Sequence, residues 1–125
     1  MAVIGLGIDI IEVSRFDSNN LDKLSKRTLT PQELTHFNSS KKQVSYLAKR
    51  FAVKEAAAKA LGTGISEKIS FQNFNIYNND LGKPVLELSG EAKALSLKKN
   101  IISNHVSISD EKHYAVAIVI FEGNK

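Results

Sequence analysis

Residues 50–64 read RFAVKEAAAKALGTG, and they form the core of the longest helix that the sequence predicts. This helix is expected over residues 41–61, and Ser40 and Gln43 have the spacing of a capping box at its start. Gly62-Thr63-Gly64 is expected to end it, because glycine readily supplies the left-handed residue that terminates a helix. One long helix is therefore predicted in the middle of the chain.

Glu55 lies in the middle of the apolar stripe predicted for this helix. The stripe consists of Val44, Leu47, Ala48, Phe51 and Ala58, which follow helical spacing. A carboxylate that faces a core is costly unless it is paired, protonated or bound to a cation. On the helix alone, an ion pair between Glu55 and Lys59 explains the pattern as well as a bound cation does.

Asp9 is a second acid in an apolar setting, within a strand predicted over residues 2–13. Gly5 and Gly7 share its face, which suggests that another element packs close to the backbone there. Alone, Asp9 is better explained as a solvent-facing strand residue. Two misplaced carboxylates on neighbouring elements instead favour one hard divalent cation such as Mg²⁺, which takes oxygen ligands and suits phosphoryl chemistry.

The composition is that of an ordinary globular domain. The 125 residues are 42% hydrophobic and 24% charged, close to globular averages, so one domain over residues 1–125 is expected. The absence of cysteine excludes disulfides, thiolate metal sites and cysteine nucleophiles, and it suits a cytoplasmic location. The apolar runs are too short to cross a bilayer, and no membrane partner is expected.

The positive charge is concentrated in one part of the chain. The net charge of the protein is +4, whereas residues 41–59 alone contain six basic residues and one acid, a net charge of +5. Such a stretch prefers an anionic partner: a nucleic acid, a phosphate ligand or an acidic protein.

The remaining sequence predicts an α+β fold. Besides the long helix, we expect a short helix or turn over residues 17–27, a capped helix over 30–37 and a helix over 91–99. Strands are expected over residues 71–77, 85–88, 101–109 and 114–121. The predicted architecture is a long helix packed on a mostly antiparallel sheet.

Several polar residues are candidates for phosphate binding. Arg50 and Lys54 are one turn apart, and Lys59 flanks Glu55. Gly62 and Thr63 offer backbone N–H groups and a hydroxyl, although a helix end explains the glycine equally well. His105 alternates with apolar strand residues, and a lone strand histidine is more often structural than catalytic.

Two segments together resemble signatures of a known family. Gly7-Ile8-Asp9-Ile10, followed by Arg15, resembles the first signature of the phosphopantetheinyl transferases, and residues 50–64 resemble the second. Residues 27–33 and His105-Val106-Ser107 are similar to the small bacterial holo-acyl-carrier-protein synthase type. The resemblance extends over residues 5–121.

This resemblance implies an enzyme of lipid metabolism, within fatty acid biosynthesis. It would transfer the phosphopantetheine moiety of coenzyme A to a serine of apo-acyl carrier protein and release adenosine 3',5'-bisphosphate. Asp9 and Glu55 match the family's Mg²⁺ ligands. Small members of the family act as homotrimers, with active sites between subunits.

The resemblance and the chemistry of phosphoryl transfer assign further roles. Lys59 is expected to stabilise the transferred phosphate, and Arg50 or Lys54 to hold other anionic groups of coenzyme A. The base that takes the serine proton is Glu55, directly or through water, or His105, which is alternatively a nucleotide ligand. The sequence leaves this choice open.

An acidic carrier protein requires a basic docking face. Arg15 matches the family's signature arginine, and Lys23, Lys26 and Arg27 lie where the family keeps basic docking residues. Lysine cannot make the planar two-point contact of arginine. Asp110 stands where many relatives carry histidine.

Two other functions compete with the transferase. A basic nucleic-acid-binding module is disfavoured because aromatic residues make up only 7% of the chain and tryptophan is absent, which leaves few aromatic side chains to stack on bases. A non-catalytic coenzyme A-binding protein would keep the phosphate contacts without turnover.

Overall fold

The computed structural model describes residues 1–125 and is built around α3 (Gln43–Leu61). As predicted, Gly62 ends this helix with a φ of 86°, and its N–H donates to the carbonyls of Ala58 and Lys59. The predicted capping box at the other end is wrong. The hydroxyl of Ser40 accepts from the Lys42 N–H, and the Gln43 amide donates to the Phe37 carbonyl.

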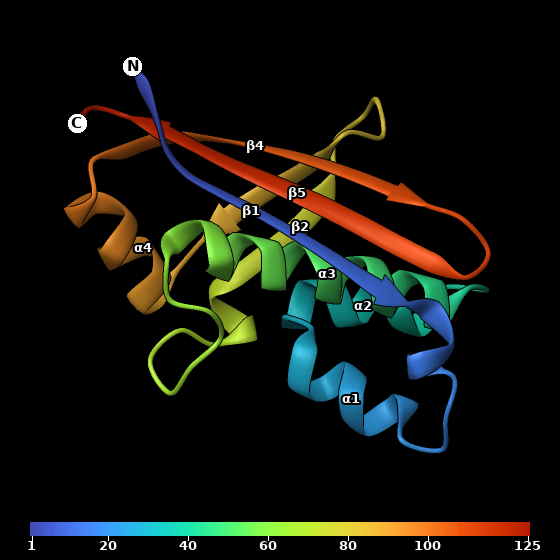
Figure 1. Ribbon diagram of the computed structural model, residues 1–125. Helices are drawn as coiled ribbons and strands as arrows, with labels where there is room; N and C mark the ends of the chain where they lie inside the picture. Colours follow the sequence, from blue (N-terminus) through green and yellow to red (C-terminus); the bar gives the residue numbers. More distant parts are fainter.

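A three-stranded antiparallel sheet covers one side of α3 (Figure 1). Its strands are β1 (Ala2–Glu12), β5 (Tyr114–Gly123) and β4 (Ile101–Asp110), in that spatial order. The register places Gly7, Val119 and Val106 side by side on the face toward the helix. The alternation of the strands turns Ile8, Ile118 and Ser107 to the opposite face.

Glycines on β1 allow the strand to cross α3 at backbone distance. A Cβ built on Gly7 would lie 1.9 Å from the Ala56 carbonyl oxygen, and one on Gly5 would lie 1.9 Å from that of Ala60. Only hydrogen fits there, which explains why both glycines share a face with Asp9. The crossing brings the carboxyl group of Asp9 toward the same helix.

Most of the remaining elements lie on the other side of α3 or at its ends, whereas β3 (Pro84–Leu88) lies beside β4 (Figure 1). The remaining elements are η1 (Val13–Phe16), α1 (Leu21–Thr28), α2 (Pro31–Ser39), η2 (Phe71–Asn73), β2 (Phe74–Asn78), β3 and α4 (Gly90–Lys98). The α+β prediction is confirmed. The strand predicted over residues 71–77 begins instead with the 3₁₀ turn of η2, and β2 and β3 form a separate two-stranded sheet.

The core surrounds α3 on two sides. Its 23 buried apolar residues include Ala52 and Ala56 of the helix, Val119 and Phe121 of β5, and Phe74 of β2. Because α3 is sandwiched between the sheet and α1, α2 and β2, its buried surface is wider than the single predicted stripe. None of the helices is long and apolar enough to cross a membrane.

Candidate functional site

Asp9, Lys59 and Glu55 converge where β1 crosses α3. The Asp9 side chain is 16% exposed, and its Oδ1 lies 3.0 Å from the ammonium nitrogen of Lys59. The same ammonium donates to the Ile8 carbonyl at 3.0 Å. Lys59 therefore pairs with Asp9, and the alternative in which it pairs with Glu55 is wrong.

Glu55 is a half-buried carboxylate with no basic partner in contact. Burial raises the pKa of Glu55, and the carboxylate of Asp9 raises it further, while Lys59 and Arg15 act in the opposite direction. Two facing acids whose charges repel each other are stabilised by a cation between them.

The oxygen donors at this crossing fit a magnesium ion. Mg²⁺ binds through one or two protein carboxylates and completes its shell with water and substrate phosphates. Asp9 and Glu55 are the two carboxylates beside Lys59 at this crossing. Such a site leaves most coordination positions open to a substrate.

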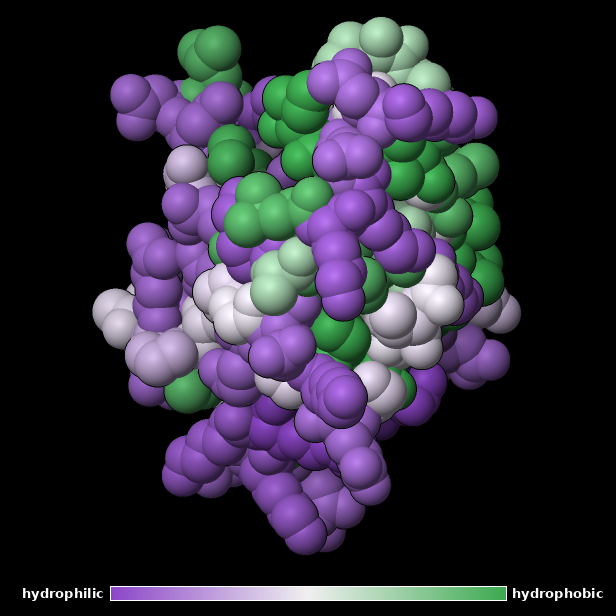
Figure 2. All heavy atoms as spheres, turned by 90° about the vertical axis from the view of Figure 1, so that its left-hand side faces the viewer, coloured by the Kyte–Doolittle hydropathy of each residue, from purple (hydrophilic) through white to green (hydrophobic).

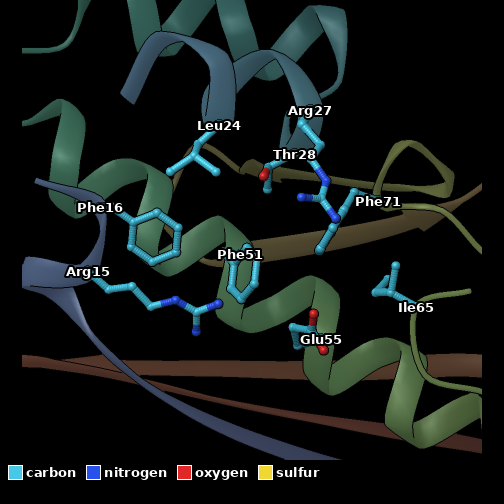
Figure 3. Close-up of a pocket in the computed structure, with 9 residues that line it drawn as sticks. All are labelled: Arg15, Phe16, Leu24, Arg27, Thr28, Phe51, Glu55, Ile65 and Phe71. Carbon is cyan, nitrogen blue, oxygen red and sulfur yellow. The ribbon is translucent and has the colours of Figure 1, made fainter. Parts of the chain in front are cut away.

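A pocket of about 330 Å³ opens beside Glu55. Figure 3 shows its lining residues: Arg15, Phe16, Leu24, Arg27, Thr28, Phe51, Glu55, Ile65 and Phe71. The guanidinium group of Arg15 lies 5.3 Å from the centre of the Phe51 ring, a distance typical of a cation–π contact. The pocket thus combines an apolar wall with two arginines and one carboxylate.

The four predicted docking residues fall into two groups. Arg15 from η1 and Arg27 from α1 line the pocket with Glu55 (Figure 3). Lys23 and Lys26 lie on the exposed surface of α1, and Lys26 forms a 3.1 Å surface ion pair with Asp22. The structure therefore brings only the two arginines to the site.

Lys54 and Arg50 lie in the interior, which contradicts their predicted role as coenzyme A ligands. The side chain of Lys54 is fully buried and pairs with Glu33 at 2.6 Å. Arg50 is 6% exposed and stacks on Tyr46, 4.5 Å from the ring centre. Helical spacing turns both side chains toward α1 and α2, away from the crossing that holds Glu55 and Lys59.

The hydrogen-bond donors of the loop after α3 already have partners within the loop and the last turn of the helix. The N–H groups of Gly62, Thr63 and Gly64 donate to carbonyls of the last helical turn. The Thr63 hydroxyl donates to the Gly64 carbonyl at 2.9 Å. In this structure the loop caps the helix, so the predicted phosphate contacts of Gly62 and Thr63 would require these bonds to open.

His105 lies on β4 with its side chain on the outer face of the sheet. The register pairs His105 with Ile120, whereas Asp9 is opposite Ala117 on the inner face. Nε2 of His105 interacts with the Glu122 carboxylate. Within one chain, the sheet therefore separates His105 from Asp9 and Glu55.

The sequence analysis missed Glu33 and the apolar wall of the pocket. The sequence indicated Glu33 only as part of the cap of the helix predicted over residues 30–37, and the structure confirms a capping box between Thr30 and Glu33. The pairing of Glu33 with Lys54, 21 positions away, depends on tertiary packing. Phe51 and Phe71, two residues of the wall, likewise come from separate elements and carry no shared sequence pattern.

Known proteins resemble this chain over nearly its whole length. The model of the 4'-phosphopantetheinyl transferase superfamily matches residues 5–119. A curated protein named holo-acyl-carrier-protein synthase, from Aliivibrio salmonicida, is 50% identical over 125 residues, covering 98% of this chain and 99% of the relative.

Solved structures give the same result. A holo-acyl-carrier-protein synthase from Neisseria meningitidis is 40% identical with a TM-score of 0.88, covering 97% of this chain and 99% of that one. The Bacillus anthracis synthase, solved in complex with CoA (3',5'-ADP), is 40% identical with a TM-score of 0.83, covering 98% of both chains.

Proposed function

This chain belongs to the 4'-phosphopantetheinyl transferase superfamily, and we propose that it works as a magnesium-dependent holo-acyl-carrier-protein synthase. It transfers the phosphopantetheine moiety of coenzyme A to a serine of apo-acyl carrier protein. The observation that supports the site is the convergence of Asp9, Lys59 and Glu55 beside a pocket lined by two arginines.

Asp9 and Glu55 are the residues that would hold the magnesium ion. When bound, Mg²⁺ supplies positive charge that neutralises the pyrophosphate of coenzyme A. Lys59 is half exposed at 50%, so its ammonium can turn from Asp9 toward a phosphate oxygen. There it would stabilise negative charge that develops during transfer.

The reaction exchanges one P–O bond for another. The serine oxygen bonds to the phosphorus that carries the pantetheine arm, and the bond from that phosphorus to the leaving adenosine 3',5'-bisphosphate breaks. The serine proton must pass to a base. Glu55 is the better candidate within one chain, because its carboxylate lines the pocket beside the crossing. The alternative base is His105 of a second copy.

The arginines of the pocket suit an acidic carrier protein. Arg15 and Arg27 flank Glu55 from two elements, and Lys23 and Lys26 extend the basic surface along α1. Opposite charges speed the encounter of two proteins and fix their relative orientation. The acceptor serine would thereby be presented to Glu55.

We propose a homotrimer assembled through the outer face of the sheet. Leu6, Ile8 and Ile10 are 58%, 58% and 64% exposed there. Their cross-strand neighbours Ile120, Ile118 and Val116 continue the apolar surface. An exposed apolar area of this kind typically marks an interface. Figure 2 shows hydrophobic residues gathered toward the upper right of one side, above a hydrophilic lower part.

The position of His105 supports a site shared between copies. His105 lies on the same outer face, at the margin of the apolar surface. A second copy packed on this face could bring its His105 toward the nucleotide bound at the first. We further propose that residues 1–125 act as one transferase domain in fatty acid biosynthesis. A cytoplasmic location stays a prediction.

The structure removes the main argument for a nucleic-acid-binding module. That argument relied on six basic residues between positions 41 and 59. Arg50 and Lys54 are buried, and Lys59 is paired with Asp9. The exposed basic stripe is therefore shorter than the sequence suggests.

The mass of the carrier protein tests the proposed function. Apo-carrier protein is incubated with the enzyme and coenzyme A, with Mg²⁺ or with EDTA, and then weighed. We expect a gain of one phosphopantetheine with Mg²⁺ only, and a fall of about 10²- to 10⁴-fold in rate for Glu55→Gln, the range usual for loss of a catalytic acid or base. Lys93→Met, an exposed change on α4, is the control. Coenzyme A binding without any mass gain would establish the non-catalytic alternative.

A further inference from the structure

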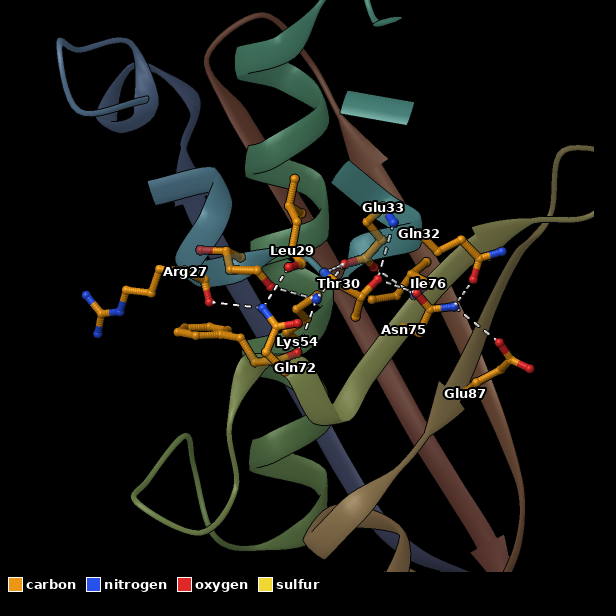
Figure 4. A network of polar contacts seen from close by, with 12 residues as sticks. Arg27, Leu29, Thr30, Gln32, Glu33, Lys54, Gln72, Asn75, Ile76 and Glu87 are labelled. Carbon is orange, nitrogen blue, oxygen red and sulfur yellow. Dashed lines mark hydrogen bonds and ion pairs between the residues drawn. The ribbon is translucent and has the colours of Figure 1, made fainter. Parts of the chain in front are cut away.

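Lys54 donates to three acceptors in the interior of the protein. Its ammonium nitrogen lies 2.6 Å from Glu33 Oε1, 2.7 Å from the Thr28 carbonyl and 3.1 Å from the Phe71 carbonyl (Figure 4). An ammonium group has three N–H donors, so every one of them has a partner.

The carboxylate of Glu33 accepts three hydrogen bonds, as the ammonium of Lys54 donates three. Its Oε1 accepts from Lys54 and from the Thr30 N–H at 2.9 Å, and its Oε2 accepts from the Ile76 N–H at 2.8 Å (Figure 4). All three partners are donors, which suits a carboxylate without a proton. The pair therefore ties α3, α2 and β2 together.

Two of the Lys54 partners belong to the pocket beside Glu55. Thr28 ends α1, Phe71 begins η2, and both residues line the pocket. Lys54 directly precedes Glu55 on α3. A single buried ammonium thus fixes two walls of the pocket relative to the helix that carries the carboxylate.

A second, weaker tie joins the same walls. The Gln72 amide of η2 donates to the Leu29 carbonyl at 2.6 Å and to the Arg27 carbonyl at 3.4 Å (Figure 4). Gln72 is exposed and uncharged, so its removal leaves no buried charge without a partner. It offers a mild way to loosen the same contact.

We propose that Lys54 is a positioning residue that sets the spacing between Glu55 and the pocket walls formed by α1 and η2. This inference builds on the proposed function, in which the carrier-protein segment around the acceptor serine enters this pocket. A buried ion pair adds little net stability compared with well-packed apolar residues. Fixing the relative position of three segments explains its presence better.

The test compares Lys54→Met with the double variant Lys54→Met/Glu33→Gln. The single variant leaves the Glu33 carboxylate buried without its cation, which is strongly destabilising. The double variant removes that charge, so it should regain part of the lost stability. In both, we expect the KM for apo-carrier protein to rise by about 10- to 100-fold, as for small displacements in an active site. The Kd for coenzyme A, measured by calorimetry, should not change.

Gln72→Ala should raise the carrier KM in the same direction by a smaller factor, and Lys93→Met should leave it unchanged. A double variant with a wild-type carrier KM, or with coenzyme A affinity lost in parallel, would overturn the inference. If the double variant does not fold, an unchanged carrier KM in Gln72→Ala would overturn it. Absence of transfer by the wild-type protein would instead contradict the proposed function.

Discussion

At the scale of single residues, the site is defined by how three charges share one crossing. Lys59 compensates Asp9 directly, while Glu55 has no cation in contact and is left with a raised pKa. The arrangement has one positive charge for two carboxylates. A divalent cation would reverse this imbalance and free Lys59 for a phosphate.

This imbalance predicts that Glu55→Gln stabilises the metal-free protein near neutral pH. The gain should be about 1 kcal/mol or less, because solvent screens a half-exposed carboxylate. As the pH falls through the raised pKa of Glu55, the folded wild type takes up a proton that the unfolded chain binds only at lower pH. The wild type then gains stability relative to the variant, so the difference narrows.

Denaturant unfolding in EDTA at a series of pH values measures this difference. Lys93→Met provides the control for a neutral surface change. A difference that widens on acidification would contradict the assignment of charge to Glu55.

The sequence predicted site residues correctly where an acidic residue stands at a position that the apolar pattern reserves for the core. Asp9 and Glu55 interrupt apolar patterns, and the structure brings them to one crossing. Lys54 was predicted to bind anionic groups of coenzyme A, because periodicity predicted only one buried stripe on the helix and Lys54 lies outside it. Burial on the other side of α3 depends on α1 and α2, which a helical pattern does not encode.

At the scale of elements, the site depends on how closely β1 approaches α3. The glycines were recognisable in the sequence as a sign of close backbone packing, and the structure shows their partners to be the carbonyls of Ala56 and Ala60. The separate β2–β3 sheet and the 3₁₀ turn of η2 had no comparable signal. Their positions are set by contacts between distant segments.

Gly7→Ala should therefore displace β1 from α3. Its methyl group would lie 1.9 Å from the Ala56 carbonyl oxygen, which backbone movement alone can relieve. We expect a loss of about 1–3 kcal/mol or more in the free energy of unfolding, the usual cost of overpacking. Transfer should also fall, since Asp9 moves with the strand. Unfolding curves and carrier mass measure both, and a variant with wild-type stability would show that the approach is looser than described.

At the scale of the whole molecule, the sheet separates two chemical faces. The inner face carries Asp9 toward α3, and the outer face carries exposed Ile8 and Ile10 together with His105. No single chain brings His105 to the carboxylates. The α+β class was predictable from periodicity, whereas this division required the strand register.

Ile8→Lys combined with Ile118→Lys should convert the proposed trimer to monomers. Two charges would then lie side by side on the outer face, because the register pairs these residues. Light scattering should report the monomer mass, and transfer should fall although the inner face is unchanged. Leu81→Lys is the control, since Leu81 is 95% exposed on the β2–β3 turn. A double variant that stays trimeric would contradict this interface.

The most direct measurement is a crystal structure grown with coenzyme A and Mn²⁺ in place of Mg²⁺, using the anomalous signal of the metal. The account predicts one metal peak bonded to both Asp9 and Glu55, with the pyrophosphate on its open side. A peak bonded to neither carboxylate, with coenzyme A bound elsewhere on the molecule, would contradict it.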